Sequence, residues 1–406
     1  MSPEVVISGA GPAGMLLAYL LAGNGVRVRV LERHKDFRRE FRGELVQPSM
    51  LGALEQLGLL PLLIQRGVAR PCASWRHFVG ARQAMRVSGG AGLSGGMFIQ
   101  QSALLELLHE LCGRMPGFRL DFGVTVDGLV RENGRVVALS VRGGAEPRIA
   151  GDVFVCCNGR QSALREEAGL VADSFQGAVH VLWLRFDLSG APQAMPEGLE
   201  VHTWGRGVVS VLFPGADGRL KVAYAEPGDL AVLAKDLPEL RRRLLPLLPE
   251  AVRAVVAPQF DERTERQVLK VKIDRLRKWW VPGLLFLGDA AHTMSPVGAQ
   301  GLNLAMRDSI VAANHFIDAL RAGRVPDGEV FQRIEAERFP EIETVQNFQV
   351  RAGRMVRAPR AAQQVGVRLV ALLARVFDLN GKMVNGVTQV GLKHPVRLPA
   401  APAVGS

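Results

Sequence analysis

The chain has 406 residues, of which 48% are apolar and 22% are charged, as is ordinary for a soluble globular protein. Its 50 Lys and Arg residues exceed its 39 Asp and Glu residues to give a net charge of +11, which favours anionic ligands. The basic residues are scattered and aromatic residues make up only 6%, so nucleic acid is not an expected partner, and no uncharged apolar stretch reaches the ~18 residues of a membrane span.

The first predicted unit runs from Val5 to His34 and reads VVISGAGPAGMLLAYLLAGNGVRVRVLERH. The β-branched run 5–7 predicts a strand, and the Ala- and Leu-rich segment from Pro12 to Asn24 predicts a helix that stops at a Gly-Asn-Gly signal. A second strand follows over 26–31 and ends at Glu32. This order of strand, glycine turn, helix, strand and acidic residue is typical of a dinucleotide-binding fold.

The glycines of this unit have the spacing G-x-G-x-x-G, which alone is a weak signal in a chain with 45 glycines. In this context each has a physical role: Gly9 permits the tight turn, Gly11 lets the backbone approach a pyrophosphate, and Gly14 lets helix and strand pack closely. The helix N-terminus offers free N–H groups to phosphates. Glu32 can accept hydrogen bonds from a ribose diol, which does not separate NAD from FAD.

Two later stretches have the same organisation. GDVFVCCNGRQSALREEAGL, 151–170, predicts a buried strand, an Asn158-Gly159 turn and a basic segment. WWVPGLLFLGDAAHTMSPVGAQGLNLAMRDS, 279–309, predicts an apolar strand that stops at Gly288-Asp289, then a loop, then a helix from about Gly301. The carboxyl end of a strand is where α/β sheets bind ligands, so both stretches are candidate sites.

Between these motifs, residues 174–268 have a different character. HVLWLRFDL, LEVHTWG and VVSVLFPGADGRLKVAYAEP predict antiparallel strands, with a hairpin turn at Ala216-Asp217-Gly218. The Leu- and Arg-rich segment 237–255 predicts a helix beside that sheet. Pro246 and Pro249 should break or kink this helix.

Together the three motifs resemble the single-component, FAD-dependent aromatic monooxygenases, the family typified by p-hydroxybenzoate hydroxylase. That family carries G-x-G-x-x-G at the start, Asp-Gly in mid-chain and Gly-Asp in the last third, and GDAAH followed by P-x-G-x-Q-G-x-N is a specific match. The resemblance implies an α/β fold: a Rossmann-like FAD-binding domain with a parallel sheet, an inserted antiparallel-sheet substrate domain and a C-terminal helical region. It divides the chain into 1–75, 96–173 and 269–330 for FAD, 76–95 and 174–268 for the substrate sheet, 331–398 for the helical region, and a tail at 399–406.

The resemblance also implies roles for single residues. Glu32 would hold the adenosine ribose of FAD, Asp289 would hold the ribityl chain, and Pro296 would line the site where oxygen meets the flavin. The helix that begins at Gly301 would direct its N-terminus, which stabilises negative charge, toward the flavin. The implied FAD contacts are Gly9, Gly11, Ala13, Gly14, Glu32, Arg33, Arg42, Gln101, Val126, Asn158, Asp289, Gly301, Leu302 and Asn303.

One position departs from the family pattern, because Asn158 stands where the family has Asp. Asn keeps the turn-forming shape and the hydrogen-bonding reach but removes a negative charge. The family motif is linked to both FAD and NAD(P)H, and we expect the change to affect reduction by a nicotinamide more than FAD binding. Arg160 and Arg165 are candidate partners for the NAD(P)H phosphates, with a solvated basic surface as the alternative.

The implied activity is hydroxylation or epoxidation of an aromatic, quinolone or quinone-like small molecule. The resemblance supplies FAD as cofactor, NADH or NADPH as electron donor, O₂ as co-substrate and a flavin C4a-hydroperoxide as the oxygen-transferring species. Tyr224, His202 and Phe213 are candidate substrate contacts, although aromatic residues in strands usually pack within the sheet. His292 is expected to pack in its loop, so no catalytic base is assigned.

Three other functions stay open on the same fold. A flavin-linked reductase or dehydrogenase would work without oxygen. A flavin-dependent halogenase would carry W-x-W-x-I-P, and this chain has no W-x-W. A non-catalytic flavoprotein is suggested by Asn158 and opposed by the intact stretch from Pro296 to Asn303.

The remaining expectations concern location. The four cysteines form no C-x-x-C pair, so we expect a reduced, cytoplasmic protein without a metal site, and the N-terminus lacks the basic region of a signal peptide. Helix is expected from 308 to about 378. Within it, the apolar segment 365–377 predicts either a docked helix or a helix on a membrane surface, which leaves peripheral membrane contact as an alternative.

Overall fold

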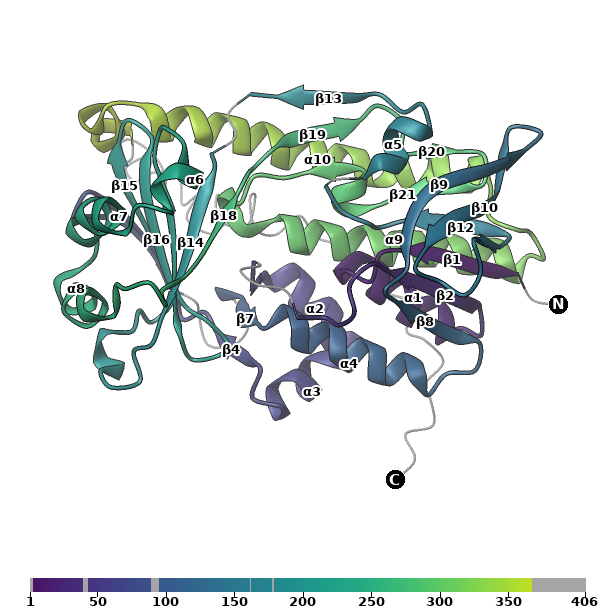
Figure 1. The fold of residues 1–406 in the computed structure, drawn as a ribbon, viewed down its shortest axis with the longest axis horizontal. Coiled ribbons are helices and arrows are strands. Elements are labelled where there is room, and N and C mark those ends of the chain that lie inside the picture. The colour runs from purple at the N-terminus through teal and green to yellow at the C-terminus, as the bar shows by residue number, and fades with distance from the viewer. Residues whose placement is uncertain (1–2, 39–42, 89–94, 161, 177–178, 367–406) are drawn as a thin grey trace.

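The fold was analysed in a computed structural model, which describes residues 3–38, 43–88, 95–160, 162–176 and 179–366. Two lobes lie side by side in Figure 1, one built on a six-stranded sheet and the other on a seven-stranded sheet. We call them the six-stranded lobe and the seven-stranded lobe. This α/β architecture confirms the predicted fold class.

The six-stranded sheet has the strand order β20-β21-β12-β1-β2-β8. Every neighbouring pair is parallel except β20 with β21. Such strands are buried on both faces and read as apolar runs, as in the fully buried Val5-Val6-Ile7. The strands are β1 (Glu4–Ser8), β2 (Arg27–Glu32), β8 (Phe118–Phe122), β12 (Val153–Cys156), β20 (Trp280–Val281) and β21 (Leu284–Phe286).

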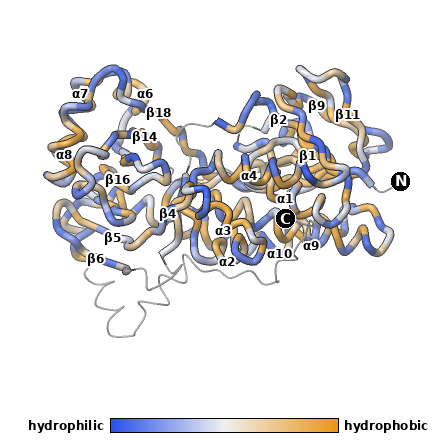
Figure 2. The backbone as a smooth tube through the Cα atoms, turned by 90° about the horizontal axis from the view of Figure 1, so that it is seen from below, coloured by the Kyte–Doolittle hydropathy of each residue, from blue (hydrophilic) through white to orange (hydrophobic). Residues whose placement is uncertain are grey.

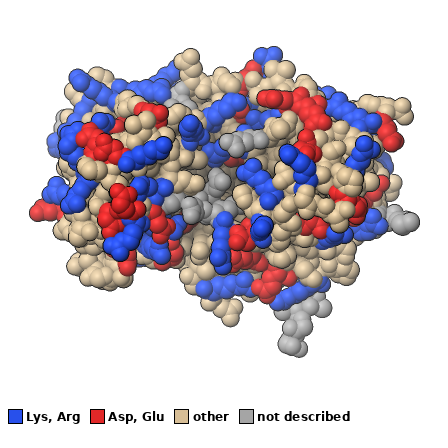
Figure 3. All heavy atoms as spheres, viewed as in Figure 1, with Lys and Arg blue, Asp and Glu red and all other residues tan. Residues whose placement is uncertain are grey.

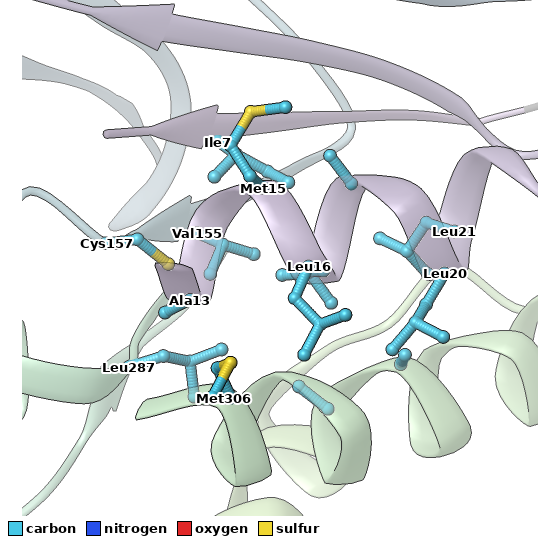
Figure 4. Packing of buried hydrophobic residues seen from close by; sticks show 14 of the residues in the cluster. Ile7, Ala13, Met15, Leu16, Leu20, Leu21, Val155, Cys157, Leu287 and Met306 are labelled. Carbon is cyan, nitrogen blue, oxygen red and sulfur yellow. The ribbon is translucent and has the colours of Figure 1, made fainter. Parts of the chain in front are cut away.

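The first helix, α1 (Pro12–Ala22), has no polar face, because it is enclosed by the sheet and by α9. Figure 4 shows Met15 of α1 beside Ile7 of β1, while Leu16 points from α1 toward α9, which carries Met306. Figure 2 shows the apolar colour concentrated along these buried elements. The other helices of this lobe are α2 (Pro48–Gln56), α3 (Leu59–Gln65), α4 (Gln101–Gly113), α5 (Ala163–Glu167), α9 (Gly301–Arg321) and α10 (Gly328–Arg357).

Three small sheets complete the lobe. One is an antiparallel ribbon of β9 (Thr125–Glu132), β10 (Arg135–Arg142) and β11 (Arg148–Ala150). Another contains β3 (Leu45–Val46), β4 (Ala69–Pro71) and β7 (Met97–Ile99). The third contains β13 (Ala172–Phe175), β19 (Ile273–Leu276) and β22 (His292–Thr293).

The seven-stranded sheet has the order β18-β14-β17-β16-β15-β5-β6 and is antiparallel apart from the β15–β5 pair. One face is covered by α6 (Leu230–Leu233), α7 (Leu237–Leu244) and α8 (Glu250–Val256), and the other faces the six-stranded lobe. The strands are β5 (Ser74–Val79), β6 (Arg82–Ser88), β14 (Val181–Phe186), β15 (Leu199–Gly205), β16 (Val208–Pro214), β17 (Leu220–Ala225) and β18 (Glu265–Leu269).

The predicted break in the helix over 237–255 is confirmed, since α7 ends at Leu244 and α8 begins at Glu250, with Pro246 in the 3₁₀ turn between them. The helical stretch expected after Asp308 consists, within the described residues, of two helices, α9 and α10, separated at 322–327 by a segment that contains Gly323 and Pro326. Most of the apolar segment 365–377, and the whole tail 399–406, lie outside the described residues.

On the face of the molecule seen in Figure 3, surface charge is mixed rather than segregated. Figure 3 shows Lys and Arg on both lobes, interleaved with Asp and Glu. Among the described residues, no helix combines the length and the apolar character that crossing a bilayer requires.

Candidate functional site

The glycine turn after β1 has the tight geometry that its sequence predicts. Gly9 has φ +104°, and a Cβ there would lie 2.5 Å from the carbonyl oxygen of Cys157, the residue just after β12. A Cβ on Gly14 would collide with the carbonyl oxygen of Gly9. Gly11 is the N-cap of α1 and provides no capping side chain. The first N–H groups of the helix, including that of Ala13, are therefore available to a ligand at the helix N-terminus.

Glu32 is buried at the end of β2, next to this turn, with 3% of its surface exposed. One carboxylate oxygen accepts a hydrogen bond from the Ala10 amide at 2.8 Å, and the other accepts from the His34 amide at 3.0 Å. The carboxylate is therefore fixed beside the glycine turn. The neighbouring Arg33 is exposed, and its Nε lies 3.2 Å from the His34 ring.

Of three other predicted cofactor residues, one lies near this end of the sheet, one opens a helix, and one is not described. Val126 is half-buried in β9. The amide of Val124, the residue just before β9, donates to the Glu32 carbonyl at 2.9 Å. Gln101 is half-buried and opens α4. Arg42 lies outside the described residues.

The backbone of the Gly288-Asp289 turn is bound by two buried charged side chains, Asp308 and Arg165. Gly288 has φ +59°, and its amide donates to Oδ2 of Asp308 at 3.0 Å. Arg165 donates to the carbonyl oxygens of Asp289 and Ala290 at 2.7 and 2.6 Å. The Asp289 carboxylate itself is partly exposed and lies 3.5 Å from Arg160. The Asp289 side chain is therefore accessible, while the backbone of the same residue is fixed by the buried Arg165.

The two arginines of the mid-chain motif occupy different environments. Arg160 is partly exposed beside Asp289, whereas Arg165 is 7% exposed and also pairs with the buried Asp274 at 3.0 Å. All three nitrogens of the Arg165 guanidinium are bound within the protein, so the structure offers no support for a phosphate-binding role there. Asn158 follows β12, and its Oδ1 accepts from the Cys156 thiol at 3.1 Å.

The loop from Pro296 to Gln300 leads into α9, which starts at Gly301 without a side-chain cap. Asn303 in its first turn is buried and donates to the carbonyl oxygens of Leu45 and Ala299 at 3.0 and 2.8 Å, while Leu302 is half-buried. Gln47 donates to the Gly298 carbonyl at 2.7 Å and accepts from Gln300 at 2.9 Å. Sequence reasoning missed Gln47, whose signal is a polar residue directly after a short apolar strand.

A buried charge network lies behind this loop. Asp308 contacts His292 Nε2 at 2.7 Å and Arg338 Nε at 2.8 Å, and all three side chains are at least 96% buried. Burial alone would raise the pKa of the Asp308 carboxyl, but His292 and Arg338 hold that pKa below its usual value. His292 is 1% exposed, packed as the sequence predicts.

The lobes meet at an apolar group that we call the interlobe cluster. Phe213 stacks on Phe98 with ring centroids 5.1 Å apart and meets Trp183 edge-on at 5.9 Å. Ala299, from the loop before α9, packs against the cluster. Trp183 is 9% exposed, and its indole nitrogen has no hydrogen-bond partner among the described residues. The members are Leu45, Cys72, Phe98, Val181, Trp183, Phe213 and Ala223.

The three predicted substrate contacts do not share a face of the seven-stranded sheet. Phe213 lies in the interlobe cluster, facing the loop before α9. Tyr224 lies on the opposite face, under α6–α8, and donates to Glu226. His202 is on that face too, stacked on Phe78 at 4.2 Å along a surface groove of about 480 Å³. Of the three, only Phe213 adjoins the residues predicted for the flavin.

These residues suit the FAD that the sequence resemblance implies. Gly9 and Gly14 let the turn pack tightly against the backbone, where a Cβ would collide, and both α1 and α9 begin without side-chain caps, so their first N–H groups are available to an anion. Glu32 presents a fixed carboxylate next to the first of these helices. Asp289 presents a second, partly exposed carboxylate near the start of α9. The donor set therefore matches a ligand with phosphates and polyol chains.

Comparison with known proteins agrees with this site. A family model described as FAD binding domain matches residues 2–347. The chain is 31% identical over 374 residues to 6-methylpretetramide 4-monooxygenase from Streptomyces rimosus, covering 87% of this chain and 84% of that protein. It is 26% identical to kynurenine 3-monooxygenase from Salinispora arenicola, covering 91% and 85%. Among solved structures, p-nitrophenol 4-monooxygenase from Pseudomonas putida has a TM-score of 0.79 at 18% identity, covering 97% of this chain and 99% of that one. The chain belongs to the family of FAD-dependent aromatic monooxygenases.

Proposed function

We propose that this FAD-dependent monooxygenase inserts one oxygen atom into an aromatic or quinone-like small molecule held against the interlobe cluster. The observation that carries the proposal is the contact of Ala299, from the Pro296 loop, with a cluster that contains Phe98, Trp183 and Phe213. An aromatic substrate needs an apolar wall and few polar contacts, and this wall adjoins the loop that leads into α9. The named relatives act on 6-methylpretetramide, kynurenine and p-nitrophenol, which are in the same chemical class.

The residues of the chain would divide the work as follows. Glu32, the Gly9–Gly14 turn and the start of α1 would bind the adenosine and pyrophosphate part of FAD, and Asp289 the polyol chain. The N-terminus of α9, at Gly301 to Asn303, would stabilise negative charge on the ring system. The interlobe cluster would exclude water. FAD, when bound, supplies the redox and oxygen-transfer chemistry.

Trp183 would provide a polar contact to the substrate. Its N–H is buried without a partner among the described residues, and such orphaned donors are rare in folded proteins. A quinone carbonyl or a phenolate oxygen would satisfy it. This feature favours a substrate that carries an acceptor oxygen on the ring.

NADH or NADPH is the proposed electron donor, with the partly exposed Arg160 as its candidate phosphate contact. Asn158 lies in the same motif, and we infer that it alters this step rather than FAD binding, because Asn keeps the turn-forming shape and hydrogen-bonding reach of Asp and lacks only its charge. Restoring the family residue with Asn158→Asp should leave bound FAD unchanged and change the rate of nicotinamide oxidation.

The test begins with the visible spectrum of the purified protein and continues with NADH and NADPH oxidation in air, with and without phenols, quinolones and quinones. Ligand-stimulated oxidation, with one atom of ¹⁸O₂ in the product, is the expected result. Turnover without oxygen would instead indicate a reductase, and a chloride-dependent product would indicate a halogenase. Bound FAD with no turnover of any compound would indicate a non-catalytic flavoprotein.

A further inference from the structure

We infer that Gln346 and Gln349 of α10 are positioning residues that hold the Pro296 loop in place beside the cofactor. The inference rests on the placement of this loop near the flavin that is proposed above. Both glutamines lie outside the three cofactor motifs, and Gln349 lies beyond the last residue that the family model matches. Their side chains are 1% and 0% exposed.

The loop needs outside partners because it belongs to no sheet. After β22 ends at Thr293, residues 294–300 contain no further strand and only a short 3₁₀ turn at Val297–Ala299, in which the Ala299 amide donates to the Pro296 carbonyl at 2.9 Å, so their other backbone groups are not paired in a ladder. Buried carbonyl and amide groups must find other partners or cost free energy. Pro296 has no N–H to donate, so its position depends on the residues on either side of it.

Gln349 binds both of those neighbours. Its Oε1 accepts from the Ser295 amide at 3.0 Å, and its Nε2 donates to the carbonyl oxygens of Ser295 and Val297 at 2.9 Å each. One planar amide therefore makes the two-point pairing that a neighbouring strand would make, and bridges across Pro296. The side chain is fully buried, so no water competes for these bonds.

Gln346, one helical turn earlier on the same face of α10, continues this pairing. Its Nε2 donates to the carbonyl oxygens of Asp274 and Thr293 at 2.8 and 3.0 Å, which ties β19 and β22 to the helix. The carbonyls of Thr293, Ser295 and Val297 thus each accept from a glutamine of α10. On the far side of the loop, Gln47 binds the Gly298 carbonyl at 2.7 Å.

The helix that carries these glutamines is itself held at both ends. Arg338, in its first half, pairs with the buried Asp308 behind the Gly288 turn. At its C-terminal end, the amides of Gly207 and Arg206, in the β15–β16 turn, donate to the carbonyls of Val356 and Ala358 at 2.9 and 3.0 Å. Figure 1 shows α10 running from one lobe to the other. A single helix, α10, therefore binds the loop and also contacts both lobes.

The test compares Gln349→Met with a matched control, Gln259→Met. Gln259 makes the same two-point pairing with a single residue, accepting from the Asp187 amide at 3.0 Å and donating to its carbonyl at 2.6 Å, but on the outer side of the seven-stranded lobe. Both variants lose one glutamine amide of equivalent bonding. Gln259 is half-buried and Gln349 is fully buried, so the loss of the amide alone can account for a difference in stability, and the FAD affinity and reoxidation rate report whether the loop serves the cofactor.

Three measurements on the FAD-loaded protein use neither a nicotinamide nor an aromatic substrate. They are hydrogen exchange of the peptide that covers 293–299, the dissociation of FAD followed by its fluorescence, and the rate at which dithionite-reduced protein reoxidises in O₂. For Gln349→Met we expect roughly tenfold faster exchange and roughly tenfold weaker FAD binding, with an altered reoxidation rate, because a buried amide and two carbonyls lose their partners. Gln259→Met should leave all three unchanged.

The inference is overturned if Gln349→Met matches Gln259→Met in exchange, FAD affinity and reoxidation. It is also overturned if exchange rises while FAD affinity and reoxidation stay at the control values, since the loop would then not serve the cofactor. If Gln349→Met does not fold, Gln349→Glu keeps the size and the acceptor and removes donors, and the same comparison decides. Failure of the proposed function would show itself elsewhere, as a lack of nicotinamide oxidation with any aromatic compound.

Discussion

Among single residues, Glu32 gives the clearest test of the FAD site. Its two oxygens are fixed by the Ala10 and His34 amides, so the carboxylate is already in position before a ribose arrives. Glu32→Gln keeps the size but removes the charge and one acceptor, and we expect FAD affinity to fall about tenfold to a hundredfold. Titration of the protein with FAD, followed by flavin fluorescence, measures this change.

The control for this prediction is Glu110→Gln on α4, an exposed carboxylate that pairs with Arg66 and Arg114 far from the glycine turn. It removes the same charge and should leave FAD affinity unchanged. Equal FAD affinity in Glu32→Gln and the wild type would contradict the assignment of Glu32 to the ribose.

The sequence predicts the strands of the seven-stranded sheet but not which face of the sheet packs against the other lobe. The strands that carry Tyr224, His202 and Phe213 are predicted from composition and turns, and each strand forms. Alternation says that neighbouring residues face opposite sides, but it does not say which side meets the other lobe. Only the packing of Ala299 and Phe98 identifies that side, and those residues are distant in sequence from the strands. For this reason Trp183 could not be distinguished from Tyr224 in advance.

Among the larger elements, α9 and α10 are joined in part by the ion pair of Asp308 with Arg338. Asp308→Asn removes one of the two carboxylates that pair with the buried Arg338, which keeps Glu341, and this should lower the free energy of unfolding by about 1–3 kcal/mol. The folded pKa of Asp308 lies below its usual value, so its contribution is present above the unfolded pKa of about 3.9 and is lost as pH falls through the folded pKa. The stability difference between wild type and variant should therefore be constant near neutral pH and shrink below about pH 4.

Urea unfolding followed by tryptophan fluorescence over this pH range provides the measurement. Glu329→Gln, which breaks an exposed pair with Arg333 on the same helix, is the control and should change little at any pH. A deficit for Asp308→Asn that persists undiminished at pH 3 would mean that ionisation of Asp308 is not what stabilises the helix pair.

The elements that could be predicted from the sequence are those whose determining residues lie close together in the chain. The unit β1–α1–β2 matches its prediction within a few residues, because turn glycines, apolar periodicity and the acidic strand end all lie within 30 residues of one another. The support of the Pro296 loop could not be predicted, since Gln47, Gln346 and Gln349 come from opposite ends of the described chain. A glutamine in a helix looks like a solvated residue until the helix is placed against a loop.

At the scale of the whole molecule, the two lobes have separate apolar cores, so the contacts between the lobes determine whether they unfold together. The six-stranded lobe and the seven-stranded lobe each have an extensive apolar core, while the interlobe cluster is small. A buried ion group lies beside that cluster: Lys221 of β17 contacts Glu44, just before β3, at 3.1 Å and Asp217 at 3.0 Å. Burial raises the pKa of the Glu44 carboxyl, and Lys221 opposes this rise.

This ion group should therefore matter for cooperativity between the lobes. Lys221→Met leaves Glu44 buried without its cation, which should cost about 3–5 kcal/mol, and Glu44→Gln should cost less because Lys221 retains Asp217. Because the two residues are in contact, the double variant should lose less than the sum of the single losses. In calorimetry, Lys221→Met should broaden or split the unfolding transition, whereas Arg219→Met, which breaks the exposed Glu265 pair within one lobe, should not. A single sharp transition at lower temperature for Lys221→Met would mean that the interlobe cluster and α10 suffice to couple the lobes, and that the ion group adds stability without adding cooperativity.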